Sequence, residues 1–248
     1  MPLHDWTRVP SGFFHHFHQF WAMEICRDLN RGRLPLGLSA LVEQRSGSRE
    51  TDVLTVELAA PDDTLQGGAA VLERPKTRIH RQTDKAYYAE KADRITIRHH
   101  LGRIVAFIEI VSPGNKDGDR ALEQFVAKIA DAMQQGIHVL VLDLFPPTTR
   151  DPAGIHKAIW DQFDREDFEL PPDQNRVFAS YESNGVQTAH IETIGLGDFL
   201  PDMPIFIAPG AHVLVPLEST YMNAWEDTPA AVRRQVVGPI QSSMQEHG

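Results

Sequence analysis

The sequence predicts an α/β protein in which helices flank a mixed β-sheet. Three consecutive segments indicate this class. Residues 104–111, IVAFIEIV, are almost all apolar, which is typical of a strand buried on both faces. Residues 119–135 repeat apolar side chains at helical spacing, and residues 137–144, IHVLVLDL, are again an apolar run. Because the order is strand, helix, strand, we expect the two strands to run parallel, with the helix as the crossover.

The N-terminal part predicts one helix followed by two strands. The helix covers residues 13–30, with Ser11 as its candidate N-cap. Residues 38–44 are a short expected strand, and the largely apolar residues 52–58 are a second one. The side chains of the helix that we expect to face the core are Phe13, Phe17, Phe20, Trp21 and Ile25.

The middle of the chain predicts further strands before the crossover. Residues 60–74 carry Pro, Asp and a Gly pair and are expected to be a surface excursion, whereas residues 76–83 alternate weakly like a strand. Residues 94–99, RITIRH, alternate well and precede the tight connection 101–103, so we expect a hairpin with residues 104–111. The crossover helix has its apolar stripe at Leu122, Phe125, Val126, Ile129 and Met133.

The C-terminal part predicts a helix and a hairpin. Residues 153–164 have helical character, and residues 177–183 and 186–194 are expected to pair around Asn184-Gly185, a strong hairpin turn signal. Residues 200–210 are Pro-rich and extended, and residues 214–221 begin a last strand or helix.

The composition is that of one ordinary globular domain. We expect a single domain over residues 1–248, with a core at about 13–145 and a C-terminal extension at about 150–235. Apolar residues make up 42% and charged residues 23% of the 248 residues, which is typical of folded soluble proteins. The single Cys26 excludes an internal disulfide and a cysteine-based zinc site. A homodimer is compatible with these data.

The net charge and the hydropathy of the chain limit the classes of partner that it is expected to bind. The formal net charge of −10 does not favour nucleic acid, since neutralisation of phosphates drives much of that binding, although a local basic groove is compatible with it. No stretch approaches the roughly 20 apolar residues of a membrane span, and the N-terminus lacks the pattern of a signal peptide. We therefore expect a cytoplasmic protein without a membrane partner.

One set of residues indicates metal-dependent chemistry. Asp52 opens a strand, and Glu109 lies inside the apolar run IVAFIEIV, where a carboxylate is costly unless it is paired or binds a metal. Two carboxylates on neighbouring strands suit Mg²⁺, which prefers oxygen ligands and can polarise a phosphoryl oxygen. Lys116 follows the run and could stabilise the developing charge. This pattern is typical of phosphodiester hydrolysis.

The chain also resembles a known family. The segment IEIVSPGNK followed by RALEQFVAKIADAMQQGIHVLVLDL is similar to the bacterial family of unknown function numbered 4058 (DUF4058). The stretches FHHFHQFW, LSALVEQR and TDVLTVE resemble the opening of that family in the same order, so the resemblance covers about residues 1–220. More distantly, the pattern is similar to the Uma-type endonucleases of the PD-(D/E)XK superfamily. This resemblance implies a restriction-endonuclease-like α-β-β-β-α-β core, followed here by a C-terminal β-hairpin extension.

The resemblance also implies site residues. The first acid of the superfamily falls on Asp52 and the strand acid on Glu109, which would ligate Mg²⁺. The motif departs from the family where Val111 stands in place of the expected lysine. Lys116 is therefore the candidate lysine, with Lys128 as a further candidate and Glu43 as an additional carboxylate.

Structural roles compete with each of these assignments. Glu109 could be a buried partner of Arg98 or Arg103, Asp52 could cap a turn, and Lys116 could be a solvated loop residue. Three histidines of the first helix, His15, His16 and His18, are expected to line an interface or cleft rather than to bind metal. His138, inside a buried strand, is expected to be a core histidine with a satisfied hydrogen bond.

Two functions follow from these residues. The first is an Mg²⁺-dependent phosphodiesterase or nuclease, a hydrolase that acts on nucleic acid through Asp52, Glu109 and Lys116. The alternative is a catalytically inactive protein of the same fold that serves as an interaction or scaffold module, for which the hairpin at Asn184-Gly185 is a candidate surface. Fold alone does not separate the two, since function depends on the site.

Overall fold

The computed structural model describes residues 3–42, 53–57, 78–86 and 102–238. The helices are α1 (Ser11–Asp28), α2 (Asp119–Gln134), α3 (Gly154–Trp160), α4 (Leu217–Asp227) and α5 (Ala230–Val237), with short helical turns at Trp6–Arg8, Leu29–Arg33 and Pro113–Asn115. The strands are β1 (Leu38–Leu41), β2 (Val53–Glu57), β3 (Ile79–Ala86), β4 (Arg103–Ile110), β5 (His138–Asp143), β6 (Arg176–Asn184), β7 (Val186–Ile194), β8 (Met203–Ala208) and β9 (Ala211–Val215). Within these ranges, no helix has both the length and the apolarity that crossing a bilayer requires.

A seven-stranded mixed sheet organises the molecule, in the order β1-β2-β4-β5-β6-β7-β3. β4 and β5 pair in parallel, whereas the other neighbours in this sheet pair antiparallel. The parallel pair with α2 as its crossover confirms the prediction from the strand–helix–strand pattern. The predicted class, an α/β protein with a mixed sheet flanked by helices, is confirmed as well.

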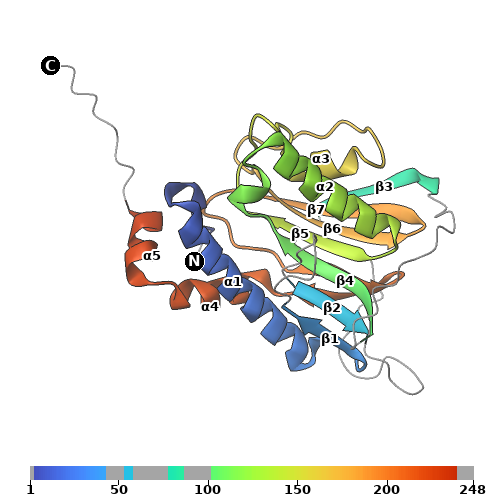
Figure 1. The fold of residues 1–248 in the computed structure, drawn as a ribbon, viewed down its shortest axis with the longest axis horizontal. Coiled ribbons are helices and arrows are strands. Elements are labelled where there is room, and N and C mark those ends of the chain that lie inside the picture. The colour runs from blue at the N-terminus through green and yellow to red at the C-terminus, as the bar shows by residue number, and fades with distance from the viewer. Residues whose placement is uncertain (1–2, 43–52, 58–77, 87–101, 239–248) are drawn as a thin grey trace.

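Two hydrophobic clusters lie on the two faces of this sheet. On one face, the apolar sides of α2 and α3 pack against alternate residues of β4 to β7. On the other face, α1, α4 and the β8–β9 hairpin pack against the residues of the sheet that point the opposite way. Figure 1 shows α2 and α3 together on one side, with α1, α4 and α5 gathered away from them. Because both faces are covered, β5 is buried at every position, which explains its unbroken apolar sequence.

The helix α1 confirms the first predicted helix but not its whole core face. Phe17, Trp21 and Ile25 are buried as predicted, but Phe13 is 39% exposed and Phe20 is 37% exposed. Phe14 takes a buried position in their place. In the run FFHHFHQFW, two phases of the helical repeat are both rich in aromatic residues, so periodicity alone does not choose between them.

The remaining predictions have mixed outcomes. The hairpin at Asn184-Gly185 is confirmed, and Gly185 has a φ of +76°, a conformation that favours glycine. This hairpin, β6–β7, belongs to the central sheet, whereas the Pro-rich residues 200–210 contribute β8 of a separate two-stranded sheet. The predicted surface excursion at 60–74 and the predicted strand at 94–99 lie outside the described residues.

Candidate functional site

Glu109 lies inside β4, on the face of the sheet that α2 covers. Phe107 and Val111, two positions before and after it, belong to the hydrophobic cluster that includes the apolar side of α2. Since side chains alternate along a strand, Glu109 points to that same face. Only 4% of the residue is exposed. A carboxylate buried to this extent requires a partner of opposite charge or several hydrogen-bond donors.

Lys128 of α2 provides that opposite charge. Its Nζ forms an ion pair with Oε1 of Glu109. The same ammonium lies 5.3 Å from the centroid of the Phe125 ring, within the range of a cation–π interaction. The Lys128 side chain is 15% exposed and the Glu109 side chain 6%. The pair therefore reaches the surface on its lysine side.

Lys116 belongs to a different and more deeply buried group. Its Nζ lies 2.5 Å from Oδ2 of Asp143 and 2.8 Å from Oδ2 of Asp151. The Lys116 side chain is 3% exposed. Asp143 ends β5, and Asp151 lies in the loop before α3, so this Lys116 cluster (Lys116, Asp143 and Asp151) ties three segments of the chain together.

Further hydrogen bonds hold both acids of the Lys116 cluster. The backbone N–H of Phe145 donates to Oδ1 of Asp143 at 3.0 Å. Oδ1 of Asp151 accepts from the backbone N–H and the hydroxyl of Thr148, at 2.8 and 2.5 Å. Because the two acids are held by loop and strand ends as well as by Lys116, the arrangement fixes the loop after β5 on the sheet.

Burial sets the charge state of the Lys116 cluster. Burial raises the pKa of Asp143 to about 6, although Lys116 lowers it, and the nearby Asp151 adds to the rise. Burial also acts to lower the pKa of Lys116, but Asp143 and Asp151 together outweigh it and hold that pKa above its ordinary value. Lys116 is therefore a permanent cation at neutral pH and cannot serve there as a base.

The candidate residues thus separate into two groups. Of the two candidate lysines, Lys128 is the one whose ion pair with Glu109 is seen, whereas Lys116 pairs with Asp143 and Asp151. Both groups lie on the α2 face of the sheet: Val139 and Val141, which alternate with Asp143 along β5, belong to the α2 cluster.

Two other candidate residues, Asp52 and Glu43, lie outside the described residues. The strand that follows Asp52 in the sequence is described: β2 begins at Val53, and Val53 pairs with Ile108, the neighbour of Glu109. Glu109 is therefore in the strand next to β2, near the end at which β2 begins.

The sequence did not single out Asp151, and the position of Asp143 at the end of an apolar run is compatible with either a strand-end cap or a side chain that faces the same cleft. The signal for Asp151 was the spacing Thr148-x-x-Asp151 in the loop after Pro146-Pro147, which is typical of side-chain hydrogen bonds within a turn. No local pattern indicates that Lys116, more than 25 residues earlier in the sequence, contacts this loop. That contact depends on the parallel pairing of β4 and β5, because it brings their C-terminal ends together.

The predicted histidines are now placed. His138 is a buried core histidine, as expected: the backbone N–H of Ser183 donates to its Nδ1 at 3.0 Å, and burial lowers its pKa to about 4. On α1, the rings of His15 and His18 stack with centroids 6.1 Å apart, and His16 lies against Phe20 at 4.7 Å.

Mg²⁺ needs several oxygen ligands, and the described residues supply only part of such a set. In the part of the chain that the structure describes, no group of three or more His, Cys, Asp or Glu side chains is arranged to hold a metal ion. Of the two predicted ligands, Glu109 is paired with Lys128, and Asp52 lies outside that part. Comparisons with protein-family models, with curated proteins and with solved structures find no match for this chain. The resemblance to family 4058 and to the Uma-type endonucleases therefore stays a prediction.

Proposed function

We propose that this chain is a metal-dependent phosphodiesterase of the restriction-endonuclease-like type, with nucleic acid as its substrate class. The observation that carries the proposal is the buried Glu109 in the third strand of the core, with the ammonium of Lys128 at its carboxylate. A carboxylate on the strand next to β2, in contact with an ammonium from α2, offers one group that can hold a metal ion and one that can stabilise developing negative charge.

The order of elements supports the same proposal. Along the chain, α1, β1, β2, β4, α2 and β5 follow one another, apart from the inserted β3, which pairs at the far edge of the sheet. Neighbouring strands in this part pair antiparallel, antiparallel and then parallel. This order agrees with the α-β-β-β-α-β core that the sequence resemblance implies.

Each residue has a proposed role. Glu109, together with Asp52, would hold Mg²⁺, which when bound polarises a phosphoryl oxygen and acidifies a water molecule. Lys128, rather than Lys116, would stabilise the negative charge that develops on the phosphoryl group. Lys116 would act as a positioning residue that holds the loop after β5 against the connection from β4 to α2.

The test is a cleavage assay on single- and double-stranded DNA and RNA with Mg²⁺ or Mn²⁺, using the wild type and Glu109→Gln. Gln keeps the shape of the side chain but removes the charge that a cation requires. We expect metal-dependent cleavage by the wild type and a loss of about 100-fold or more in Glu109→Gln, as for other groups that act in the transition state. Lys128→Met should lose activity as well.

A matched control separates the site from general effects of a buried mutation. Glu24 is also a buried glutamate, 6% exposed, and pairs with Arg27 at 2.5 Å on α1, in the other layer of the molecule. Glu24→Gln should keep full activity. Equal cleavage by Glu109→Gln and the wild type, or equal losses in both glutamine variants, would contradict the role of Glu109.

A second candidate function has its own support. Glu109 is 4% exposed, and Lys128 already neutralises it, so the fold is electrostatically complete without a cation. This observation favours a non-catalytic member of the same fold that acts as an interaction module. A folded wild type that cleaves none of the four nucleic acids with either metal would support this second function over the first.

A further inference from the structure

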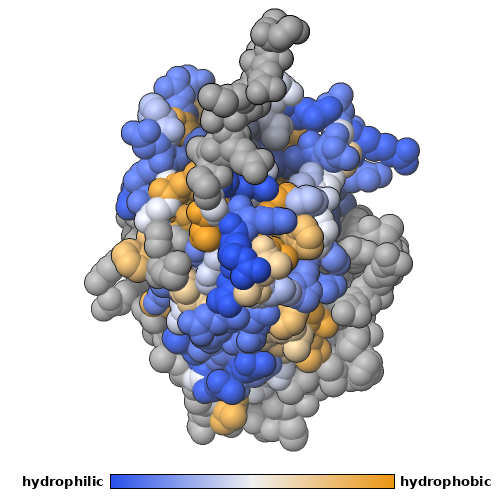
Figure 2. All heavy atoms as spheres, turned by 90° about the vertical axis from the view of Figure 1, so that its left-hand side faces the viewer, coloured by the Kyte–Doolittle hydropathy of each residue, from blue (hydrophilic) through white to orange (hydrophobic). Residues whose placement is uncertain are grey.

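A layer of buried polar side chains lies between the central sheet and the β8–β9 hairpin. On the face of the molecule in Figure 2, hydrophilic side chains lie at the surface around smaller hydrophobic patches, which is their ordinary place. The layer beneath the hairpin reverses this order. Its members, which we call the histidine layer, are each 4% exposed or less: His138 of β5, Ser180 of β6, His190 of β7 and His212 of β9.

Phe206 of β8 packs among the three imidazole rings of this layer. Its ring centroid lies 6.0 Å from that of His138, 5.2 Å from that of His190 and 5.4 Å from that of His212. Phe206 and His212 are register partners in the hairpin, so both side chains point to the same face of it. Phe206 is 1% exposed but belongs to neither hydrophobic cluster. This part of the hairpin therefore lies on imidazole rings rather than on the apolar core.

The turn end of the hairpin, residues 206–212, can move without breaking the central sheet. The hairpin forms a two-stranded sheet of its own, so the hydrogen-bond ladders of the seven-stranded sheet do not include it. Pro209 and Gly210 at the tip are exposed. The backbone N–H of Gly210 donates to Oε1 of Glu182 on β6 at 2.7 Å, and this contact holds the tip against the sheet.

We propose that protonation of the histidine layer opens the turn end, so that the β8–β9 hairpin is a pH-responsive cover of this face of the sheet. The hydrogen bond at His138 shows why the closed form requires a neutral ring. Nδ1 of His138 accepts from the backbone N–H of Ser183 at 3.0 Å, so the neutral ring carries its proton on Nε2. A proton added at Nδ1 would place one donor against another and break this hydrogen bond.

The surroundings of His212 disfavour a charged ring as well. In the part of the chain that the structure describes, Nδ1 of His212 is buried without a hydrogen-bond partner. An imidazolium ring has two N–H donors, and a buried donor without an acceptor is costly. Burial accordingly lowers the pKa of His138 to about 4 and also lowers the pKa of His212. Opening the turn end would expose both rings to water and remove this cost.

The elements around the histidine layer bring several other titratable or charged groups: Glu182 of β6, Glu192 of β7, His80 of β3, and Arg31 and Arg33 of the helical turn beside β9. Glu192 pairs with Arg78 at 3.2 Å, and Glu182 accepts from Gly210. Both carboxylates therefore already have partners, and burial sets the pKa of His138 and of His212.

The pH dependence of opening has a defined sign. The pKa of His138 is about 4 in the closed form, whereas its ordinary value is 6.5. The closed form is therefore fully favoured above pH 6.5, and this advantage is lost as the pH falls toward 4. Between pH 7.5 and pH 5, we expect the equilibrium constant for opening to rise about 30-fold through His138 alone. His212 adds to this rise.

Amide hydrogen exchange tests the opening. After correction for the intrinsic pH dependence of exchange, peptides that cover residues 203–215 of the wild type should exchange about 30-fold faster or more at pH 5 than at pH 7.5. Peptides from α2, on the opposite face of the sheet, should keep their corrected rate and serve as the internal reference. No rise in the hairpin, or an equal rise in α2, would overturn the proposal.

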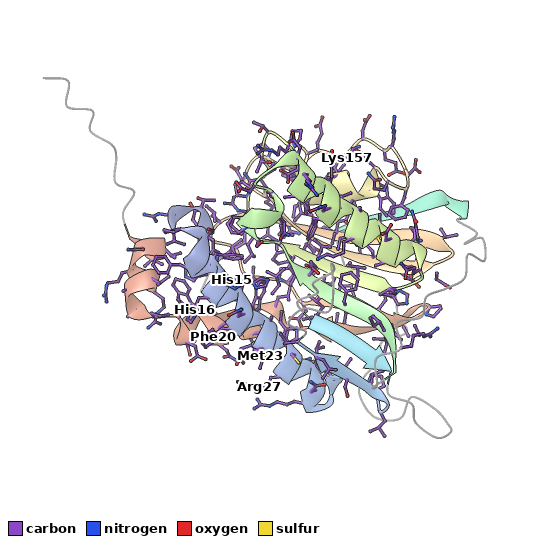
Figure 3. The ribbon with its side chains drawn as sticks, viewed as in Figure 1. His15, His16, Phe20, Met23, Arg27 and Lys157 are labelled. Atoms are coloured by element: carbon purple, nitrogen blue, oxygen red, sulfur yellow. The ribbon has the colours of Figure 1, made fainter. Side chains whose placement is uncertain are left out.

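Glutamine variants test the histidines themselves. Gln can still accept from the N–H of Ser183 but does not titrate, so His138→Gln should show a rise about 30-fold smaller than the wild type does. His212→Gln should also lower the rise and provides a second test if His138→Gln does not fold. His15→Gln is the matched control, since His15 is an exposed histidine of α1 (Figure 3), and it should keep the full rise. An undiminished rise in the folded His138→Gln or His212→Gln variant would overturn the proposal.

Discussion

Lys128 and Lys116 both neutralise carboxylates on the α2 face of the sheet, but in different surroundings. Lys128 pairs with Glu109, and its side chain is 15% exposed. Lys116 faces two acids, and its side chain is 3% exposed. Hydrogen bonds from Phe145 and Thr148 hold those two acids further. One pair can therefore open toward solvent, whereas the other group is sealed.

This difference assigns different roles to the two lysines. A group that contacts a substrate must be accessible from the surface. Of the two lysine side chains, that of Lys128 is the more exposed. In a sealed cluster, ion pairs and hydrogen bonds act mainly to hold the segments that they join, here the loop after β5. We therefore propose that Lys116, which follows the apolar run in the sequence, is a residue of the scaffold and that Lys128 of α2 belongs to the proposed site.

The largest expected effect separates the two lysines by stability. Lys116→Met leaves two buried carboxylates without their cation, so we expect a loss of about 3–5 kcal/mol in the free energy of unfolding, or roughly 6–20 °C in Tm for a chain of this size. Lys128→Met should cost less, about 1–3 kcal/mol, because this site is nearer to water. Thermal and denaturant unfolding measure both; equal losses in the two variants would remove the distinction.

A smaller effect concerns pH and tests the sealed cluster. Burial raises the pKa of Asp143 to about 6 in the folded state, above its ordinary value of 3.8. The folded protein therefore binds this proton more tightly than the unfolded chain. The stability that this proton provides is fully present below about pH 4 and is lost as the pH rises through 6.

Asp143→Asn removes this contribution. For each protein, the quantity to compare is the change in the free energy of unfolding from pH 6.5 to pH 4. This change should be less favourable in the variant than in the wild type by about 1–3 kcal/mol. Comparing each protein with itself cancels the constant cost of the substitution. The check is urea unfolding at several pH values, and parallel profiles for the two proteins would show that Asp143 titrates as it does in water.

The smallest effect is expected at a surface pair that resembles Lys128–Glu109 only in its chemistry. Lys157 lies in α3 and pairs with Asp161, the residue that directly follows this helix. Both side chains are partly exposed, at 22% and 36%. In Figure 3, Lys157 lies far from the labelled residues of α1. Lys157→Met should change the free energy of unfolding by less than about 0.5 kcal/mol. A cost as large as that of Lys128→Met would mean that burial does not distinguish these pairs.

Sequence periodicity could predict the frame of the site but not all of its contacts. The apolar run around Glu109 identified a buried strand with an acid inside it, and the amphipathic stripe of α2 identified the helix that covers it. Which lysine meets Glu109 depends on the rotation of α2 about its axis and on where α2 crosses the sheet. Both Lys116 and Lys128 satisfy the local pattern, so the sequence alone could not select between them.

The same limit explains the error at α1. Phe13 and Phe20 lie in one phase of the helical repeat, and Phe14, Phe17 and Trp21 lie in another. Both phases are aromatic, and the choice is made by α4, whose Thr220 accepts a hydrogen bond from the Trp21 ring N–H at 3.1 Å. That contact spans 199 positions in the sequence, so no local pattern contains it.

The most direct test of the assignment of Glu109 is the binding of Mn²⁺, followed by the electron paramagnetic resonance signal of the free ion. We predict that the wild type and Glu24→Gln bind the ion equally and that Glu109→Gln loses this binding, while all three proteins have the same circular dichroism spectrum. Undiminished Mn²⁺ binding by Glu109→Gln, or no binding by the wild type, would contradict a metal site at Glu109.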